Sequence, residues 1–415
     1  MKSVAVLSMH TSPLAQPGTG DGGGMNVYVR ELCSALARSG TQCDVFTRSW
    51  SADLPPVVPV EPGLRVHHVE AGPAAPLPKE RLVDHVEEFA EGVLGRLDAG
   101  PWGPGAAPID AVHANYWLSG MAGHIVKHRL DLPLVCTFHT FARVKSEHGE
   151  PDRPEDVFRA AAEAEVIGCS DAVLASNPLE AEQIVRLYGA DPDRVPVVAP
   201  GVDHAFFAPG DRAQARRALG LPAAPVLMFC GRIQPLKAAD VAVRALGRLA
   251  RSFPQAFLVV LGGPSGSGGE AELERLRRLV GELGLETRVR FVPPQPHELV
   301  STFYRAADVV VVPSRSESFG LVALEAAACG TPVVAAAVGG LRSLVRHGET
   351  GFLIGERSDA AFAEAIAAVL SDPARAAAMS ARAVQAARSY TWSTAAGALR
   401  RLHGELSAGR LVECR

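Results

Sequence analysis

The chain alternates short, continuous apolar runs with segments of helical periodicity, and it does so in two series. Apolar strands separated by helices predict parallel sheets that are covered by helices on both faces. A polar, proline-containing stretch at about residues 200–224 divides the two series. The pattern therefore predicts two doubly wound α/β domains. The apolar runs are 3–9, 42–47, 64–69, 109–114, 133–138, 171–176 and 195–199 in the first series, and 225–230, 256–262, 288–292, 308–312, 332–337 and 351–354 in the second.

The length of the chain agrees with this division. A chain of 415 residues is too long for one core and fits two domains of roughly 200 residues each. Ligands of such sheets gather at the carboxyl ends of the strands, so we expect two facing domains with one cleft between them. The expected segments are a first domain over 1–205, a second over 206–389 and a C-terminal helix within 390–415 that links them. Further helices are expected at 25–39, 79–98, 236–252, 269–284 and 318–329.

Charge and cysteine content narrow the function classes. The net charge is −4, from 41 basic and 45 acidic residues, so no global field favours nucleic acid or an anionic membrane as a partner. The seven cysteines form no closely spaced pair, which predicts buried reduced thiols and neither a metal site nor a disulfide framework. Residues 1–9 lead directly into an apolar strand without the features of a signal peptide. We therefore expect a cytoplasmic protein.

One segment near the C-terminus, residues 313–325, combines two carboxylates with a strand-to-helix turn. Glu317 and Glu325 lie eight positions apart, and Gly320 between them lets a ligand approach the backbone. The start of the following helix offers free N–H groups and a positive dipole end. This suits a sugar nucleotide, whose hydroxyls need acceptors and whose phosphates need N–H donors; a capped helix with two surface glutamates is the alternative. The serines expected to cap this helix are Ser314, Ser316 and Ser318.

Two cations follow the first strand of the second series. Arg232 and Lys237 lie five positions apart, one at the end of the strand and one at the start of the next helix. Both side chains can therefore lie above the sheet, where they would neutralise a departing diphosphate. Each charge-assisted contact would contribute roughly 1.5–3 kcal/mol. The alternative is an ordinary solvated turn.

A glycine-rich loop precedes the first expected helix. Residues 18–23 match the spacing G-x-G-x-x-G of dinucleotide-binding proteins. In that fingerprint the first glycine directly follows a strand, whereas here nine positions separate Met9 from Gly18, and Asp44 lies inside a strand instead of ending one. We therefore reject a dinucleotide site. The loop is predicted to form an anion-receptive helix start, with a purely structural hinge as the alternative.

Taken together, G-R-x-x-x-x-K at 231–237 and E-S-F-G-L-x-x-x-E at 317–325 resemble family-four retaining glycosyltransferases of the GT-B fold. Segments 10–28, 116–120, 139–140 and 263–266 resemble one branch of that family. That branch moves N-acetylglucosamine from UDP-GlcNAc to 1D-myo-inositol 3-phosphate in mycothiol biosynthesis. The resemblance covers nearly the whole chain. It implies a nucleotide-sugar donor, a small phosphorylated acceptor and retention by a front-side route that needs no cofactor for the chemistry.

The resemblance also implies roles for the matching positions. Catalytic roles fall to His139, Arg232, Lys237 and Glu317, of which His139 would orient the donor sugar. Donor contacts fall to Gln16, Pro17, Gly24, Arg232, Lys237, Gln295, Glu317 and Glu325. Acceptor contacts fall to His10, Lys79, Tyr116, Thr140 and Arg159, with Lys79 and Arg159 as the phosphate-binding pair. A structural Mg²⁺ is implied near Tyr304, Arg305, Ala307 and Thr331.

Several positions depart from the family pattern. Asn115 stands where the family has histidine, Phe138 is bulkier than expected beside the acceptor pocket, and residues 146–155 and 163–165 diverge. A related transferase with another nucleotide sugar or another acceptor therefore remains an alternative. A UDP-sugar epimerase and a non-catalytic sugar-nucleotide sensor are further alternatives, and a homodimer is left open.

Overall fold

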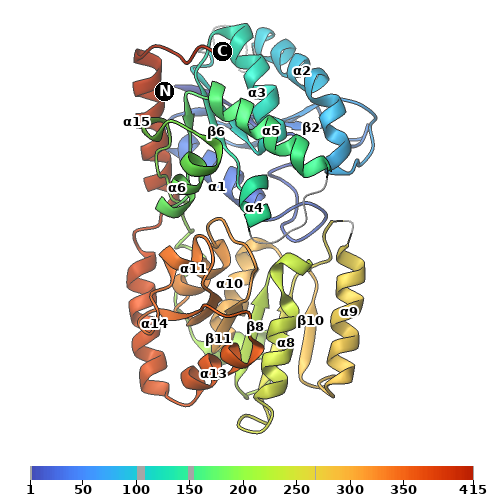
Figure 1. Ribbon diagram of the computed structural model, residues 1–415, viewed down its shortest axis with the longest axis vertical. Helices are drawn as coiled ribbons and strands as arrows, with labels where there is room; N and C mark the ends of the chain where they lie inside the picture. The colour runs from blue at the N-terminus through green and yellow to red at the C-terminus, as the bar shows by residue number, and fades with distance from the viewer. Residues whose placement is uncertain (1, 101–107, 148–153, 267, 415) are drawn as a thin grey trace. The chain divides into compact units, whose positions relative to one another are not determined.

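The computed structural model describes residues 2–100, 108–147, 154–266 and 268–414. The chain divides into two compact units, each built around a parallel sheet (Figure 1). The predicted pair of doubly wound α/β domains is therefore confirmed. Unit 1 comprises Met1–Ala15, Met25–Gly201 and Trp392–Arg415, and unit 2 comprises Gln16–Gly24 and Val202–Thr391.

Within the described residues, unit 1 contains a sheet of seven strands in the order β3-β4-β2-β1-β5-β6-β7. Neighbouring strands are parallel except β3 and β4, which are antiparallel. The strand bounds are β1 Ser3–Leu7, β2 Gln42–Arg48, β3 Val57–Glu61, β4 Leu64–Val69, β5 Ala111–Asn115, β6 Leu134–Thr137 and β7 Ala172–Val173.

Helices cover this sheet, and α2, α3 and α5 pack beside one another in a row (Figure 1). Buried apolar side chains fill the space between helices and sheet, among them Leu7, Phe89 and Leu118. The helices of unit 1 are α1 Gly24–Arg38 (its first residue counted with unit 2), η1 Lys79–His85, α2 Val86–Asp98, α3 Trp117–Leu130, α4 Ala142–Glu147, α5 Pro154–Cys169, α6 Pro178–Tyr188, η2 Pro192–Arg194 and α15 Trp392–Ala408.

Two elements of unit 1 differ from the prediction. Strand β3 was not expected, and Pro59 in its middle explains why: proline is tolerated in a sheet only at an edge, which is where β3 lies. The expected strand at 195–199 is reduced to one bridge between Ala175 and Val197. Pro196 and Pro200 flank that bridge and lack the N–H groups that a longer ladder needs.

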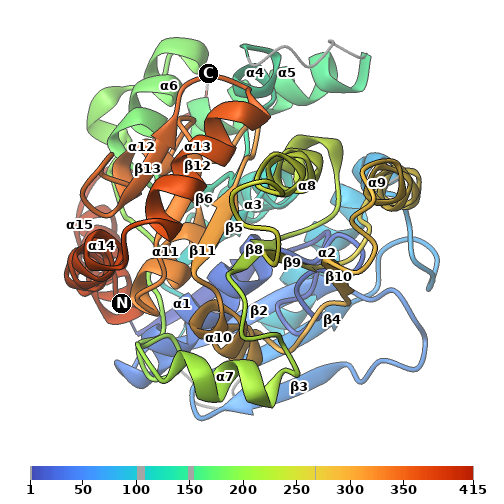
Figure 2. The ribbon, with the colours of Figure 1, turned by 90° about the horizontal axis from the view of Figure 1, so that it is seen from below.

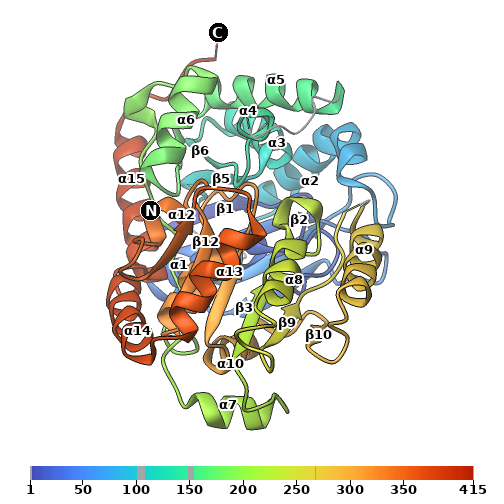
Figure 3. The same cartoon turned by 60° about the horizontal axis from the view of Figure 1, so that its bottom comes forward.

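In the described part of unit 2, six parallel strands follow the order β10-β9-β8-β11-β12-β13, at the positions that the second series of apolar runs predicts. Helices α8, α9 and α13 cover one face, and α7 and α10 lie on the other (Figure 2). Figure 3 shows α8 and α13 side by side on the first face. The strand bounds are β8 Val226–Cys230, β9 Phe257–Leu261, β10 Val289–Val292, β11 Val309–Val312, β12 Val333–Ala336 and β13 Gly351–Ile354.

Helices α8, α9 and α11 of unit 2 lie within the predicted segments and have shorter bounds. The helix expected over 236–252 is split, because Ala238 has a positive φ of 50° and separates a 3-10 turn from α8. The bounds are α7 Arg212–Ala218, η3 Pro235–Lys237, α8 Ala239–Arg248, α9 Gly269–Glu282, α10 His297–Ala306, α11 Leu321–Ala328, α12 Leu341–Leu344, α13 Asp359–Leu370 and α14 Pro373–Ala387.

Two segments belong to a different unit from the residues that adjoin them in the sequence. The glycine loop 16–24 is part of unit 2, where the Ser265 hydroxyl donates a 2.6 Å hydrogen bond to the Gly20 carbonyl. Helix α15 is part of unit 1, where Arg400 donates to the Ser39 carbonyl at 3.0 Å and Trp392 packs edge-on against Tyr28. Among the helices of the described residues, none combines the length and apolar character needed to cross a bilayer.

The cysteines correct one expectation. Cys169 and Cys414 form a disulfide with Cα atoms 5.0 Å apart, so the prediction of reduced thiols without a disulfide is wrong for this pair. A separation of 245 residues explains the error, because spacing along the chain carries no information about such a contact. The remaining cysteines are free thiols, namely Cys33, Cys43, Cys136, Cys230 and Cys329.

Candidate active site

The loop that carries Arg232 in unit 2 is fixed by a close backbone approach at the ends of β8 and β9. The Gly231 N–H donates to the Leu261 carbonyl at 3.0 Å, and the Ile233 N–H donates to the Gly263 carbonyl at 2.8 Å. A Cβ atom on Gly262, whose φ is 146°, would lie 1.9 Å from the Gly231 oxygen. Only glycine therefore allows the two strand ends to run this close.

Arg232 lies against the glycine loop. A Cβ atom on Gly23 would be 3.2 Å from the Arg232 Nε atom, so the absence of a side chain at Gly23 leaves room for the guanidinium. Arg232 is half-buried, and within the described residues its side chain donates no hydrogen bond and forms no ion pair. This cation is therefore available to an anionic ligand.

The glycine loop also contacts the segment after β10. The Gln16 side-chain amide donates to the Gln295 carbonyl, and Gly18 packs beside Pro294. At the end of the loop, Gly24 lies next to Leu321, the first residue of α11. The structure thus brings together the predicted donor positions Gln16, Pro17, Gly24, Arg232 and Gln295 within unit 2.

Lys237 and Glu317 form an ion pair. Their Nζ and Oε2 atoms are 2.6 Å apart, and the side chains are 21% and 19% exposed. The Ser314 hydroxyl donates to the same carboxylate oxygen at 3.2 Å, and the Arg315 N–H donates to the Leu236 carbonyl at 2.8 Å. The sequence predicted that Lys237 binds phosphate and that Glu317 binds sugar, without a contact between the two residues. In the structure they form one half-buried ion pair.

The start of α11 differs from the prediction. The residue before the helix is Gly320, with a φ of 104°, and in the described chain no side chain caps the helix there. The prediction that Ser314, Ser316 or Ser318 holds the N-cap position is therefore wrong, because the helix begins at Leu321, three residues beyond the last of these serines, and Gly320 precedes it. Gly320 itself offers no side-chain acceptor to the first N–H groups of α11, an arrangement that suits a phosphate.

Glu325 on α11 is buried, 6% exposed, and held by two side chains of α10. Tyr304 donates its hydroxyl to one carboxylate oxygen at 2.8 Å, and His297 Nε2 lies 2.7 Å from the other. Burial raises the pKa of Tyr304 well above its ordinary value, so this hydroxyl stays protonated as a donor. A carboxylate accepts about four hydrogen bonds, so Glu325 retains capacity for a ligand hydroxyl. No sequence motif pointed to His297, although it lies only two positions after Gln295.

The predicted Mg²⁺ positions offer mainly backbone groups. The Tyr304 carbonyl already accepts hydrogen bonds from the Thr331 hydroxyl at 2.7 Å and from the Ala307 N–H at 3.2 Å. The Arg305 guanidinium donates to the carbonyls of Phe206 and Ala208. None of the four residues has a carboxylate, the usual protein ligand of Mg²⁺, so this set alone does not fit the ion.

In unit 1, three predicted acceptor positions meet at the carboxyl ends of the strands. The rings of His10 and Tyr116 are 4.4 Å apart, and the Arg159 guanidinium lies 4.9 Å from the centre of the Tyr116 ring. Tyr116 directly follows β5 and has a positive φ of 76°. Such backbone strain in a non-glycine residue is typical of functional sites.

Arg159 is fixed in place by residues around it. It is 7% exposed, its Nη2 atom donates to the Thr140 hydroxyl at 3.0 Å, and its Nε atom donates to Glu163 at 2.7 Å. Glu163 in turn accepts a hydrogen bond from the Tyr188 hydroxyl. Among the described residues, Arg159 Nη1 donates no hydrogen bond, so one edge of the guanidinium remains for a ligand.

His139 lies beside Asn115 and Tyr28. Its Nε2 atom is 2.9 Å from the Asn115 Oδ1 atom, and its ring packs edge-on against the Tyr28 ring with centres 4.8 Å apart. Because Oδ1 only accepts, Nε2 carries the proton. Burial lowers the pKa of His139 to about 3, which keeps the ring neutral at physiological pH. Its φ of 63° is a second strained position in unit 1.

The structure also places two further positions of unit 1. The Phe138 side chain is 1% exposed and packs against Phe141 in the core. Lys79 starts the 3-10 turn η1, and its contact with an acceptor phosphate stays a prediction. Most of the divergent loop 146–155 lies outside the described residues.

Comparison with known proteins identifies the family. Residues 22–206 match the model Glycosyltransferase Family 4, and residues 211–388 match the model Glycosyl transferases group 1. The chain is 47% identical over 414 residues to the D-inositol 3-phosphate glycosyltransferase of Actinosynnema mirum, covering 98% of this chain and 97% of that protein. It is 50% identical to the protein of that name from Nocardia farcinica, and the match covers 95% of this chain and 88% of that protein.

The chain is a family-4 glycosyltransferase of the GT-B fold. Among solved structures, the sucrose-phosphate synthase of Thermosynechococcus elongatus is similar to it, with a TM-score of 0.90, 32% identity and coverage of 98% and 100%. The Anabaena protein HepE in complex with UDP and glucose has a TM-score of 0.77 at 20% identity, covers 98% and 100%, and supports the fold alone. This glycosyltransferase is therefore an enzyme of the hexosyltransferase class.

Proposed function

We propose that this glycosyltransferase moves N-acetylglucosamine from UDP-GlcNAc to 1D-myo-inositol 3-phosphate with retention at the anomeric carbon. The observation that carries the proposal is the Arg232 guanidinium beside Gly23, on the same loop as Lys237; Arg232 has no ion-pair partner among the residues that the structure describes. A fixed cation at this position suits a diphosphate. The relatives named D-inositol 3-phosphate glycosyltransferase support the choice of acceptor.

On the donor side, each group has a counterpart in a sugar nucleotide. Arg232 and Lys237 would bind the diphosphate, Glu317 the hydroxyls of the transferred sugar, and Glu325 the ribose. Gln295 would bind the uracil through its backbone, while Gln16, Pro17 and Gly24 would contact the donor from the glycine loop. The Lys237–Glu317 ion pair supports this assignment, because phosphate and transferred sugar are covalently joined in the donor and their ligands should be adjacent.

On the acceptor side, a phosphate monoester needs positive charge and hydrogen-bond donors. Arg159 supplies the charge and an Nη1 edge that donates to no other described residue, and Tyr116 and Thr140 supply hydroxyls next to it. His10 would contact the cyclitol ring, and Lys79 would add a second cation to the phosphate. The contact between Arg159 and Thr140 is the part of this set that the geometry supports best.

The reaction would proceed by departure of the diphosphate and attack of the acceptor hydroxyl on the same face of the sugar. The bond between the anomeric carbon and the diphosphate oxygen breaks, the bond to the acceptor oxygen forms, and the acceptor proton passes to the leaving phosphate. Arg232 and Lys237 would stabilise the charge that develops on the leaving group. His139, neutral because burial lowers its pKa to about 3, would position the sugar as a hydrogen-bonding group and would not carry charge.

The decisive experiment incubates the protein with a panel of nucleotide sugars, with and without inositol 3-phosphate, and identifies the products by mass. Formation of an N-acetylglucosaminyl inositol phosphate together with UDP supports the proposal, and the anomeric configuration measured by NMR tests retention. A product with another sugar or acceptor would favour a related transferase. An altered UDP-sugar without acceptor would indicate an epimerase, and binding without UDP release would indicate a sensor.

We further propose that the chemistry requires no cofactor and that the enzyme acts in the cytoplasm. Partners would be small molecules, without nucleic acid or membrane, and a homodimer is compatible with this function. Activity that survives treatment with a chelator supports the metal-independent reaction. Loss of turnover that Mg²⁺ restores would contradict it.

A further inference from the structure

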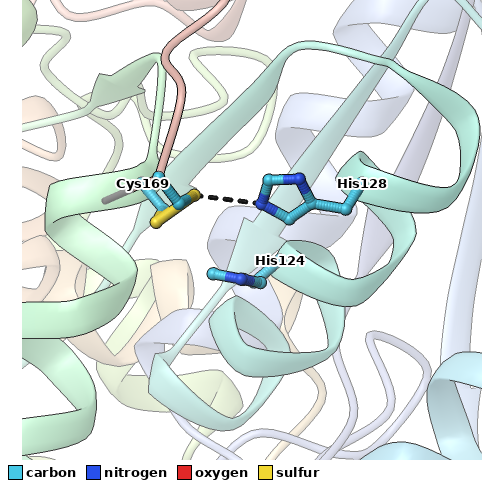
Figure 4. Close-up of side chains that lie close together, drawn as sticks. His124, His128 and Cys169 are labelled. Atoms are coloured by element: carbon cyan, nitrogen blue, oxygen red, sulfur yellow. Dashed lines mark hydrogen bonds between the residues drawn. A yellow bond between two sulfur atoms is a disulfide. The ribbon is translucent and has the colours of Figure 1, made fainter.

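A cluster of metal-ligating side chains lies in unit 1, apart from the candidate active-site residues. His124 and His128 occupy successive turns of α3, and their rings lie beside Cys169 (Figure 4). The sulfur of Cys169 is bonded to that of Cys414, which completes the cluster. One ligand atom from each of the four residues lies within 4.8 Å of all the others. The His128 Nε2 atom is 3.0 Å from the Cys414 Sγ atom.

We propose that the reduced protein binds a divalent zinc-type cation through His124, His128, Cys169 and Cys414. Two sulfurs and two imidazole nitrogens form the Cys₂His₂ set that is common in structural zinc sites. Zn–N bonds of about 2.0–2.1 Å and Zn–S bonds of about 2.3 Å place the ligand atoms of a tetrahedral site roughly 3.3–3.8 Å apart. The observed cluster reaches that geometry with small shifts of side chains, once the two sulfurs are no longer bonded to each other.

The histidines are the feature that a disulfide alone does not require. Residues four apart on a helix project from the same face, so His124 and His128 present two nitrogens in one direction. Cys169, at the end of α5, is buried, whereas His128 is exposed, so the cluster opens to solvent on one side. A cation can therefore enter without unfolding of the unit.

Hydrogen bonds hold the two sulfur-bearing segments in position. The Asp171 carboxylate accepts from the Val412 N–H at 2.7 Å, two residues before Cys414, and from the Lys127 ammonium at 2.8 Å. Lys127 also donates to the Cys169 carbonyl at 2.8 Å. These bonds do not involve the sulfurs, so the segment near Cys414 remains beside α3 when the disulfide is reduced.

The cation and the disulfide exclude each other because they use the same sulfurs. Reduction by tris(2-carboxyethyl)phosphine breaks the S–S bond, converts the phosphine to its oxide with the oxygen of water, and leaves two thiols. Binding of the cation then displaces the two thiol protons. The bound cation would fasten the C-terminal segment to α3 and α5 in the reduced protein, as the disulfide does in the oxidised one.

The test uses the full chain after reduction, with Co²⁺ as a spectroscopic probe in place of zinc. We expect one equivalent of Co²⁺ per chain, with the intense visible bands of a tetrahedral site and a sulfur-to-metal charge-transfer band. C414S and the double variant H124Q/H128Q should lose these bands and bind Co²⁺ at least about 100-fold more weakly than the parent protein. C33A removes a cysteine outside the cluster and should retain the spectrum.

Because Cys414 lies outside the helices and strands of unit 1, C414S is expected to fold, and circular dichroism checks this. The number of thiols that a titration detects should rise on reduction from five, the free cysteines, to all seven. A weak octahedral spectrum, equal Co²⁺ binding by the parent protein and C414S, or two thiols that stay oxidised after phosphine treatment would each overturn the proposal.

Discussion

The ammonium of Lys237 and the carboxylate of Glu317 lie 2.6 Å apart in unit 2. This distance couples the group proposed to bind the donor diphosphate to the group proposed to bind the donor sugar. The pair stabilises each charge at a half-buried position, and it leaves Arg232 as the neighbouring cation without a protein partner in the described chain. Removal of either member therefore affects both parts of the proposed donor site.

Replacement of Lys237 by alanine should lower kcat by roughly 10- to 100-fold, because one charge-assisted contact of about 1.5–3 kcal/mol to the leaving group is lost. Steady-state kinetics with saturating donor and acceptor measure this. The double variant K237A/E317Q shows how much of the loss comes from leaving Glu317 unpaired. R251A removes an exposed cation of the same unit and should not change kcat. A K237A enzyme with near-normal kcat would refute the leaving-group role.

Substitution of Arg159 should weaken acceptor binding by roughly 10- to 100-fold, since a charge-assisted phosphate contact is removed. R159A alone would leave the buried Glu163 carboxylate without its cation, so R159A/E163Q should be compared with E163Q. Isothermal titration with the acceptor and, separately, with UDP measures the two affinities. Loss of UDP affinity with unchanged acceptor affinity would show that the assignment is wrong.

Introduction of a methyl group at Gly339 should impair donor use. A Cβ atom there would lie 1.8 Å from the Glu317 carbonyl oxygen, and the residue has a φ of 44°, so the 317–319 loop must move. We expect kcat/KM for the donor to fall at least about 10-fold in G339A, comparable to misplacement of one catalytic group. G355A, where the added atom meets nothing within 4 Å, is the control. Unchanged donor kinetics in G339A would contradict the role of this packing.

The stability of unit 1 should fall in mild acid because of buried histidines. Burial lowers the pKa of His113 to about 4 and those of His139 and His403 to about 3. Between these values and the ordinary pKa near 6.5, the unfolded chain binds more protons than the folded one, so the free energy of unfolding decreases as the pH falls. Three such groups contribute up to about 4 kcal/mol per pH unit.

Urea unfolding at pH 5.5 and 6.5, followed by tryptophan fluorescence, tests this, since the described tryptophans Trp50, Trp117 and Trp392 all belong to unit 1. H113N should reduce the pH dependence of the free energy of unfolding by up to about one third, because one of the three buried histidines no longer titrates. H347Q alters a histidine of unit 2 and should leave it unchanged. A free energy of unfolding that is the same at both pH values would rule out this mechanism.

The sequence alone was sufficient for the fold class, the six strands of unit 2 and the motifs near Arg232 and Glu317. These features depend on local apolar periodicity and on residues close together in the chain, and both can be recognised without tertiary contacts. The edge strand β3 was not predicted, because Pro59 in its middle is unusual for a strand. The N-cap of α11 was assigned to serines, whereas the helix begins only after Gly320.

Tertiary structure alone decided which distant residues meet. It brought the glycine loop 16–24 into unit 2 and helix α15 into unit 1, paired Lys237 with Glu317, and placed His297 on Glu325. It also joined Cys169 to Cys414 across 245 residues, beside two histidines of α3. Such contacts arise from the packing of whole elements, so no periodicity or spacing along the chain encodes them.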